Sequence, residues 1–335
     1  MTEQALLNLI SGSIWKDERP TDIPAEIVSE AQHQAVAELI QLLEGHGIPL
    51  VILKGAAAAV YYPVPSRRSF GDIDFLVSPE RFLDTVKLLE ENGYIRGEDN
   101  ERHIAYRKGG IHFELHRRYS HEDIDIERYV LDGLEHRVTG RIDQHEFPML
   151  PPLANGLVLL DHMRSHLKTG LGLRQVIDWM MYCHKELNDG FWQDSFRFAA
   201  EEAKLTTLAI TATALCQKYL GLTSDITWCC DADEALVDEL LNNLLMSGNF
   251  GRKQGLGNGV EKVTTAFRRE GLVRRLQRAG EHNWKVYHRN HRLRPWCWLY
   301  QIFRYMRQGI GRIRYVRADI ARGNERYELL KKLGI

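Results

Sequence analysis

The strongest constraint on the fold lies in segment 72–77, Asp-Ile-Asp-Phe-Leu-Val, where acidic and apolar residues alternate before an apolar end. In a half-buried strand, a period of two sends the apolar side chains into the core and leaves Asp72 and Asp74 together on the opposite face. Two carboxylates this close repel each other and raise one another's pKa unless a cation neutralises them. Because a hard divalent ion such as Mg²⁺ prefers carboxylate oxygens, the segment predicts a strand that carries a metal-binding pair.

A second strand is expected at residues 111–116, Ile-His-Phe-Glu-Leu-His, where apolar and polar residues again alternate. Glu114 falls on its polar face together with His112 and His116. Either histidine could orient the glutamate, exchange a proton or contact an acceptor, and a structural histidine is the alternative. If the two strands lie side by side, three carboxylates form a cluster able to hold two metal ions. Such clusters serve phosphoryl and nucleotidyl transfer.

A phosphate-binding turn is expected after the apolar run at 49–53, which predicts a buried strand. Lys54 and Gly55 follow this strand and precede a small-residue helix at 56–62. The free N–H groups of a helix N-terminus favour a phosphate, and glycine lets a phosphate approach the backbone. Lys54 is therefore predicted to contact a triphosphate, with an ordinary solvent-exposed lysine as the alternative. Arg68 is expected either to clamp triphosphate oxygens or to form a structural ion pair.

In their order along the chain, these residues resemble a known family. The motifs are Lys54-Gly55, Arg68, Asp72-Ile73-Asp74 and Glu114-Leu115-His116. They are similar to the uncharacterised bacterial nucleotidyltransferase family of the DNA polymerase beta superfamily, over about residues 45–185. Lys54-Gly55 stands in place of the Gly-Ser pair of most of the superfamily, as in this subfamily. Glu114 stands where the subfamily usually has Asp, and both residues supply a carboxylate.

The resemblance implies a bacterial enzyme with a metal-dependent site and a nucleotide substrate. Asp72, Asp74 and Glu114 would be catalytic and would hold two Mg²⁺ ions, with Mn²⁺ as an alternative ion and a nucleoside triphosphate as donor. The resemblance extends to a helical segment that contains His162, His166, Lys168, Arg174 and Asp178. The nucleotide-binding residues that it predicts are Lys54, Gly55, Arg68, His116, His166, Lys168 and Asp178. For the residues of the helical segment, packing between helices is the alternative.

The periodicity of the whole chain predicts an α+β fold. A small mixed-sheet nucleotidyltransferase core with flanking helices is expected first, followed by a helical C-terminal half. Helices are expected at 25–46, 79–92, 153–168, 172–187, 191–203 and 205–220, a hairpin at 103–117 around Gly109-Gly110, and further strand at 135–149. The predicted domains are residues 1–150, 151–250 and 251–335, with a glycine-dense connection at 248–259.

The net charge, the cysteine spacing and the lack of a long apolar run limit the class of protein. The formal net charge of −1 gives no overall attraction to nucleic acid or to an anionic membrane. The five cysteines show no Cys-x-x-Cys pair and no zinc-ligand spacing, so free thiols in a reducing cytoplasm are expected. The sequence shows neither an export signal nor an apolar run long enough to cross a bilayer, which predicts a soluble cytoplasmic protein without a membrane partner.

The C-terminal residues 263–332 are strongly basic and aromatic, with arginines placed among Trp, Tyr and Phe. Phosphate charge and base stacking would both find partners on such a surface, so RNA is one candidate acceptor. The alternative is an amphipathic helical bundle whose aromatic side chains pack inside and whose arginines are solvated.

The sequence thus predicts an Mg-dependent nucleotidyltransferase that moves an NMP group from an NTP to a hydroxyl of an unidentified acceptor and releases pyrophosphate. A small molecule, a protein and an RNA all remain open as the acceptor. The alternative is a catalytically inactive protein of the same fold that binds a nucleotide or RNA. The presence of all three acids favours the enzyme, because a degenerate copy would be expected to lack at least one of them.

Overall fold

The computed structural model describes residues 25–68, 70–119, 126–168, 170–223, 225–247, 272–309 and 313–335. The chain divides into two compact units. The sheet unit consists of Met1–Arg164 and Leu173–Asp238, and the C-terminal unit consists of Ser165–Gly172 and Glu239–Ile335. The domain boundaries expected near 150 and 250 stay a prediction.

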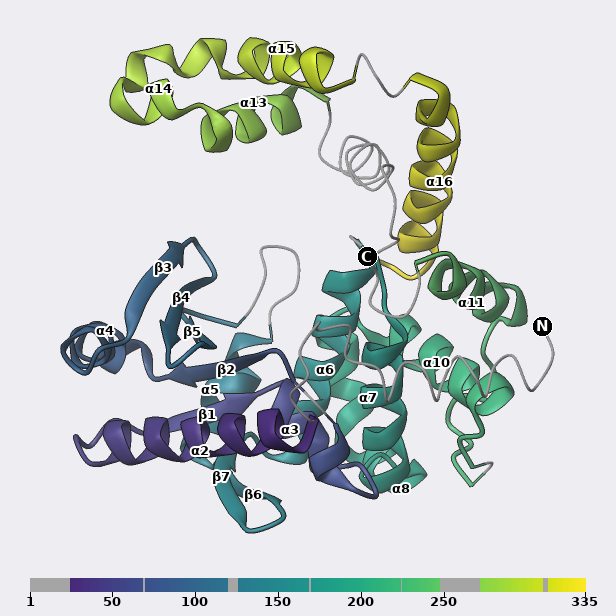
Figure 1. The fold of residues 1–335 in the computed structure, drawn as a ribbon. Coiled ribbons are helices and arrows are strands. Elements are labelled where there is room, and N and C mark those ends of the chain that lie inside the picture. The colour runs from purple at the N-terminus through teal and green to yellow at the C-terminus, as the bar shows by residue number, and fades with distance from the viewer. Residues whose placement is uncertain are drawn as a thin grey trace. The chain divides into compact units, whose positions relative to one another are not determined.

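The described residues of the sheet unit contain a seven-stranded mixed sheet in the order β3-β4-β5-β2-β1-β7-β6 (Figure 1). Its strands are β1 (Leu50–Leu53), β2 (Asp72–Val77), β3 (Ile95–Asp99), β4 (His103–Lys108), β5 (Ile111–His116), β6 (Val138–Ile142) and β7 (His145–Met149). At the centre, β2 pairs in parallel with β5 and antiparallel with β1, while β1 pairs in parallel with β7. The predicted α+β fold with a mixed sheet is therefore confirmed.

The central strands are buried, as the apolar run at 49–53 predicts for β1, whereas β2 is buried beyond the half that its alternation predicts. All four residues of β1 are buried, and β2 is buried from its second residue to its end. Sheets whose strands pair in parallel are covered on their faces by helices, which favours such continuous apolar runs. The helices that precede or follow these strands are α2 (Ala25–Glu44), α3 (Gly55–Ala59), α4 (Phe82–Glu91) and α5 (Glu127–Glu135).

Some elements differ from the sequence prediction. The helix expected at 56–62 is shorter, because α3 ends at Ala59, and the helix expected at 79–92 begins with the 3₁₀ turn η2 (Pro79–Arg81). Strand β3 and helix α5 were not expected from the sequence. The five residues of β3 are exposed along its whole length, so the strand lacks apolar alternation and is held at the sheet edge by antiparallel pairing with β4.

Helices complete the sheet unit. They are α6 (Pro152–Leu167), whose end belongs to the C-terminal unit, α7 (Leu173–Lys185), α8 (Asp189–Phe191), α9 (Arg197–Glu202) and α10 (Thr206–Leu215). The helices expected at 191–203 and 205–220 each include a π-helical turn, η3 (Trp192–Phe196) and η4 (Cys216–Leu220). Trp179, Tyr182 and Phe196 are buried with ring centroids 5.4 to 6.0 Å apart, and they form the aromatic core between α7 and η3.

Helix α11 (Glu234–Ser247) leads into the C-terminal unit, which continues with α13 (Leu272–Asn283), α14 (Lys285–Arg289), η5 (His291–Trp296), α15 (Cys297–Gly309) and α16 (Ile313–Lys332). In Figure 1, α13 and α15 lie side by side. Trp284 stacks on Tyr300 with ring centroids 5.0 Å apart, whereas Trp296 and Phe303 are exposed. Aromatic packing inside a bundle therefore accounts for only part of this segment. The glycine-dense connection expected at 248–259 lies outside the described residues.

Two predictions about the cysteines and the helices can be compared with the structure. All five cysteines are unpaired, which agrees with the expected free thiols; Cys230 is exposed and the others are buried. Throughout the described ranges, each helix is too short or too polar to cross a membrane.

Candidate active site

The parallel pairing of β2 with β5 brings two acids opposite each other. Asp74 pairs in register with Glu114, and Asp72 pairs with His112. Because residues opposite each other in a sheet share a face, the Asp74 and Glu114 side chains converge on one side of the sheet. The Asp74 side chain is 5% exposed and that of Glu114 is 24% exposed, while Asp72 is exposed at the beginning of β2.

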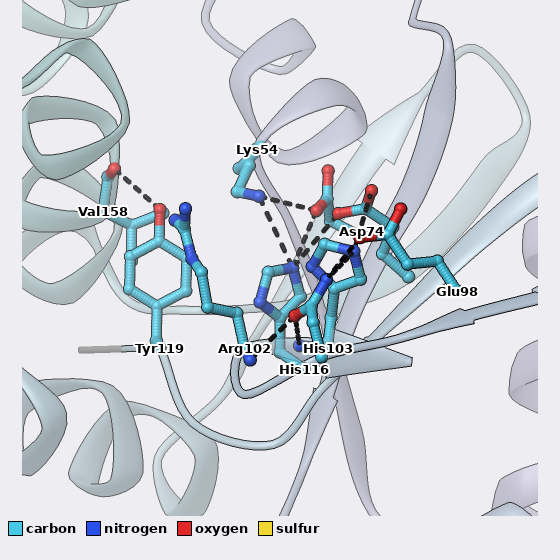
Figure 2. Close-up of polar contacts among 10 residues, drawn as sticks. Lys54, Asp74, Glu98, Arg102, His103, His116, Tyr119 and Val158 are labelled. Atoms are coloured by element: carbon cyan, nitrogen blue, oxygen red, sulfur yellow. Dashed lines mark hydrogen bonds and ion pairs between the residues drawn. The ribbon is translucent and has the colours of Figure 1, made fainter. Parts of the chain in front are cut away.

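Lys54 reaches this pair from the end of the neighbouring strand. Leu53 pairs with Asp74 across β1 and β2, so Lys54 leaves the sheet beside the carboxylate. Its Nζ lies 2.6 Å from Asp74 Oδ1 and 3.4 Å from His116 Nε2. Figure 2 shows Lys54 pointing toward both side chains. The Lys54 backbone has φ 49° and ψ −112°, a conformation that costs a non-glycine residue energy and that is found mainly where function requires it.

Two histidines and a tyrosine surround the carboxylates. His116 is buried, and its Nε2 donates a hydrogen bond of 2.8 Å to Asp74 Oδ1. His103 on β4 pairs in register with His116, and its Nε2 lies 3.5 Å from Glu114 Oε1. The Tyr119 ring lies 5.7 Å from the His116 ring and 5.8 Å from Lys54 Nζ, and its hydroxyl donates to the Val158 carbonyl (Figure 2).

His103 and Tyr119 were not among the residues predicted from the sequence. A signal for His103 was nevertheless present, because Gly109 and Gly110 both have positive φ and form a two-residue hairpin turn. Such a turn fixes the register of its strands, and this register places His103 opposite His116. Tyr119 follows β5 in an irregular segment, and the sequence holds no comparable signal for it.

The pKa values in this cluster move in opposite directions. Burial and the Asp74 charge raise the pKa of Glu114 well above its usual range. Burial alone would do the same to Asp74, but Lys54 and His116 outweigh it and hold the pKa of Asp74 well below its usual range. Burial and the Lys54 charge lower the pKa of His116 to about 4, so this imidazole is neutral at pH 7. Desolvation and the Asp74 charge raise the pKa of Asp72.

This donor set fits a hard divalent cation. Asp74, Glu114 and His116 each offer a ligand atom, and these atoms all lie within 4.8 Å of one another. Asp72 supplies a further carboxylate from the same strand, although it is not part of that group of three. Burial first and the Asp74 charge second raise the pKa of Glu114, and the single ammonium of Lys54 offsets this only in part. Carboxylate oxygens in this crowded arrangement are the ligands that Mg²⁺ prefers.

Arg68 and Asp178 bind each other. The Arg68 guanidinium donates to both Asp178 oxygens, over 3.0 Å and 2.6 Å, and both side chains are buried. Tyr62 donates a third hydrogen bond of 2.7 Å to Asp178. Burial lowers the pKa of Arg68 and Asp178 raises it by more, so the guanidinium stays charged. The pair joins the segment before β2 to helix α7.

The remaining predicted residues are placed as follows. Gly55 is buried at the start of α3, and a Cβ on it would lie 2.7 Å from the Phe70 Cβ, so only glycine allows this approach. His166 lies in the last turn of α6 and Lys168 follows that helix. Both belong to the C-terminal unit, and their role at the site stays a prediction.

Several known proteins are similar to this chain. In sequence, residues 25–221 match a family described as an uncharacterised nucleotidyltransferase. No curated protein matches the sequence. Among solved structures, ANT(2")-Ia in complex with adenylyl-2"-tobramycin has 12% identity and a TM-score of 0.41, covering 51% of this chain and 98% of that one. A nucleotidyltransferase-like antigen from Paracoccidioides brasiliensis has 17% identity and a TM-score of 0.37, covering 59% of this chain and 96% of that one.

The family match covers more than half of the chain, including β1, β2 and β5 and therefore every residue of the carboxylate cluster. The chain belongs to the uncharacterised nucleotidyltransferase family.

Proposed function

We propose that the protein transfers an NMP group from an NTP to a hydroxyl of an acceptor and releases pyrophosphate, in a reaction that requires Mg²⁺. The observation that carries this proposal is the register of Asp74 opposite Glu114, with Lys54 Nζ 2.6 Å from Asp74 Oδ1. A cation beside paired acids is the arrangement that positions and neutralises a triphosphate. Membership of a nucleotidyltransferase family supports the same reaction class.

Asp72, Asp74 and Glu114 would hold two Mg²⁺ ions. When bound, these ions would supply activation of the attacking oxygen and neutralisation of charge on the triphosphate and pyrophosphate. His116 holds Asp74 by its hydrogen bond and contributes no charge of its own, because the pKa of the imidazole is about 4. Asp74 is thereby kept in one orientation before any ligand arrives.

Glu114 is the residue that we propose accepts the proton of the acceptor hydroxyl. It is more exposed than Asp74, and because burial and the Asp74 charge raise its pKa, its carboxylate is a stronger base than that of an ordinary glutamate once it is ionised. Lys54 is proposed to contact the triphosphate. Its Nζ lies beside Asp74, so a phosphate that binds there would be close to the metal-binding carboxylates.

For the other predicted residues, the proposed roles follow from their surroundings. Arg68 and Asp178 stabilise the segment that leads to Asp72, and the Arg68 charge contributes to the potential at Asp72. Gly55 allows Phe70 to pack against α3 immediately before β2. His166 and Lys168 remain candidate contacts for the nucleotide.

The test is calorimetric titration of each of the four ribonucleoside triphosphates, with and without Mg²⁺, into the wild type and an Asp72→Asn, Asp74→Asn double variant. Binding that needs both Mg²⁺ and the acids supports the proposal and identifies the base. Asp132→Asn is a matched control, because its side chain is 74% exposed on α5 and should not affect binding. Triphosphate binding that ignores the acids would contradict the assigned site. Release of labelled pyrophosphate then provides the assay for acceptors.

A non-catalytic RNA-binding function is the second candidate, favoured by the aromatic side chains of the C-terminal unit. Trp296, Trp298 and Phe303 are exposed in a segment rich in arginine, which suits stacking on unpaired bases. This alternative predicts a salt-sensitive affinity for single-stranded RNA that survives in the Asp72→Asn, Asp74→Asn variant but is lost in a Trp296→Ala, Trp298→Ala variant. The enzyme proposal predicts instead that the two acids are needed for turnover whether or not RNA binds.

A further inference from the structure

A second group of metal-ligand side chains lies where helix α2 meets strand β7. Glu30 and His33 are three residues apart on α2, so they share one face of the helix. His145 is the first residue of β7. The ligand atoms of the three side chains all lie within 4.8 Å of one another. None of the three residues belongs to the carboxylate cluster on β2 and β5.

The distances within this group suit a tetrahedral metal ion. His145 Nε2 lies 3.3 Å from Glu30 Oε1 and 3.4 Å from Glu30 Oε2. Two ligand atoms that are each about 2.0 Å from a zinc ion at a tetrahedral angle are ~3.3 Å apart. The His33 and His145 rings are neighbours, with centroids 5.2 Å apart and planes inclined by 31°.

The chemistry of the group also favours a metal over a simple ion pair. His33 is 5% exposed, so its imidazole is buried beside His145. Neutral imidazole is the form that binds metal ions, and two imidazoles with one carboxylate form a common ligand set for zinc. A surface ion pair would need only Glu30 and His145. It would not explain why the buried His33 imidazole lies beside them.

The surroundings leave room for a further ligand. A pocket of about 180 Å³ opens beside the group and is lined by His33, Gln144, His145, Glu146 and Phe147 among others. A site with three protein ligands and water in the remaining position is a recurring zinc arrangement.

We propose that Glu30, His33 and His145 bind a divalent transition-metal ion, with zinc as the preferred metal, and that this ion fastens helix α2 to the β6–β7 hairpin. A hydrogen bond from α2 connects this helix to the segment before the candidate active site. Gln32 on α2 donates a hydrogen bond to the Phe70 carbonyl, two residues before Asp72. A metal that orders α2 would thereby support the segment from which β2 begins.

The test uses Co²⁺ as a spectroscopic probe and zinc as a competitor. The titrations are made on an Asp74→Asn, Glu114→Gln background, so that the carboxylate cluster does not bind the probe. We expect one equivalent of Co²⁺ to give the visible absorption of a tetrahedral site and zinc to displace it. Glu30→Gln is the decisive variant because the Glu30 side chain is 60% exposed, so the change should leave the fold intact. It should weaken Co²⁺ binding by more than about 10-fold, since even the outer partners of metal ligands have effects of that size.

His136→Asn is the matched control. His136 forms an exposed pair with Asp132, and among the described residues it belongs to no group of three possible metal ligands. It should bind Co²⁺ as the background protein does. A second readout, hydrogen exchange of the α2 amides, should show slower exchange with zinc in the background protein and no change in its Glu30→Gln or His145→Asn variant. Equal Co²⁺ affinity in the Glu30→Gln and control proteins, or zinc binding that leaves α2 exchange unchanged, would overturn the proposal.

Discussion

Replacing either aspartate of β2 with asparagine should abolish nucleotidyl transfer, but the two changes should affect stability differently. Asp74 and Lys54 form an ion pair of 2.6 Å with side chains only 5% and 14% exposed. Removing one partner of a buried pair costs about 3–5 kcal/mol, because the other charge is left without compensation. The asparagine carbonyl can still accept a hydrogen bond from Lys54, so we expect Asp74→Asn to lower the free energy of unfolding by about 3 kcal/mol.

Asp72→Asn should leave stability nearly unchanged. Asp72 is exposed, and its pKa is raised by desolvation and by the Asp74 charge. A raised pKa means that the ionised carboxylate is disfavoured in the folded state, so at pH 7 this charge opposes folding. A neutral asparagine therefore gives a stability equal to or slightly above that of the wild type, within about 0.5 kcal/mol for an exposed position.

Both variants are to be compared with the wild type by urea unfolding at pH 7 in the presence of a chelator, followed by circular dichroism. Midpoints are compared only where the slope of the transition is unchanged. The Asp74 effect also has a defined pH dependence: its folded pKa is depressed, so its stabilisation is present above the unfolded pKa of about 3.9 and is lost as the pH falls below that value. Equal destabilisation by the two variants, or a loss below about 1 kcal/mol for Asp74→Asn, would refute the assignment of a buried Lys54–Asp74 pair.

Three further substitutions test other parts of the sheet unit. Arg68→Lys removes the bidentate contact with buried Asp178, so urea unfolding should show a free energy of unfolding lower by about 3 kcal/mol. An unchanged midpoint would contradict a structural role for this pair. Tyr106→Phe removes a buried hydroxyl that has no hydrogen-bond partner among the described residues, so stability at pH 7 should be equal or higher. Burial raises the pKa of Tyr106 to about 12, so the unfolded chain ionises first and wild-type stability should fall between about pH 10 and 12. Alkaline unfolding of the Tyr106→Phe variant should show a smaller fall in stability. Identical curves for the two proteins would refute this. Gly156→Ala places a Cβ 2.4 Å from the Tyr182 ring, and thermal unfolding should report a loss of about 1–3 kcal/mol unless α6 and α7 can separate at no cost.

Much of the carboxylate cluster could be predicted because the information is local. The alternation at 72–77 and 111–116 fixes which residues share a face, and both segments form strands, although Asp74 and His116 on the polar face are buried as well. The sequence alone does not fix which strands are neighbours, so the Asp74–Glu114 register had to be assumed. The structure supplies that register through the order β5-β2-β1. His103 lay within reach of sequence reasoning, since the turn at Gly109-Gly110 determines which β4 residue faces His116.

Other contacts could not be predicted because they join segments that lie far apart in the sequence, and no local pattern links their side chains. Arg68 and Asp178 are separated by 110 residues, and the sequence left open whether Arg68 would bind a triphosphate or an acid. The same limit applies to His33 and His145, which lie on a helix and a strand that no local pattern connects. Residue type suggested a function for Arg68, whereas no sequence pattern singled out His33 or His145. Their partners follow only from the packing of α7 near the segment before β2 and of α2 against β7, which is where long-range burial rather than periodicity decides the structure.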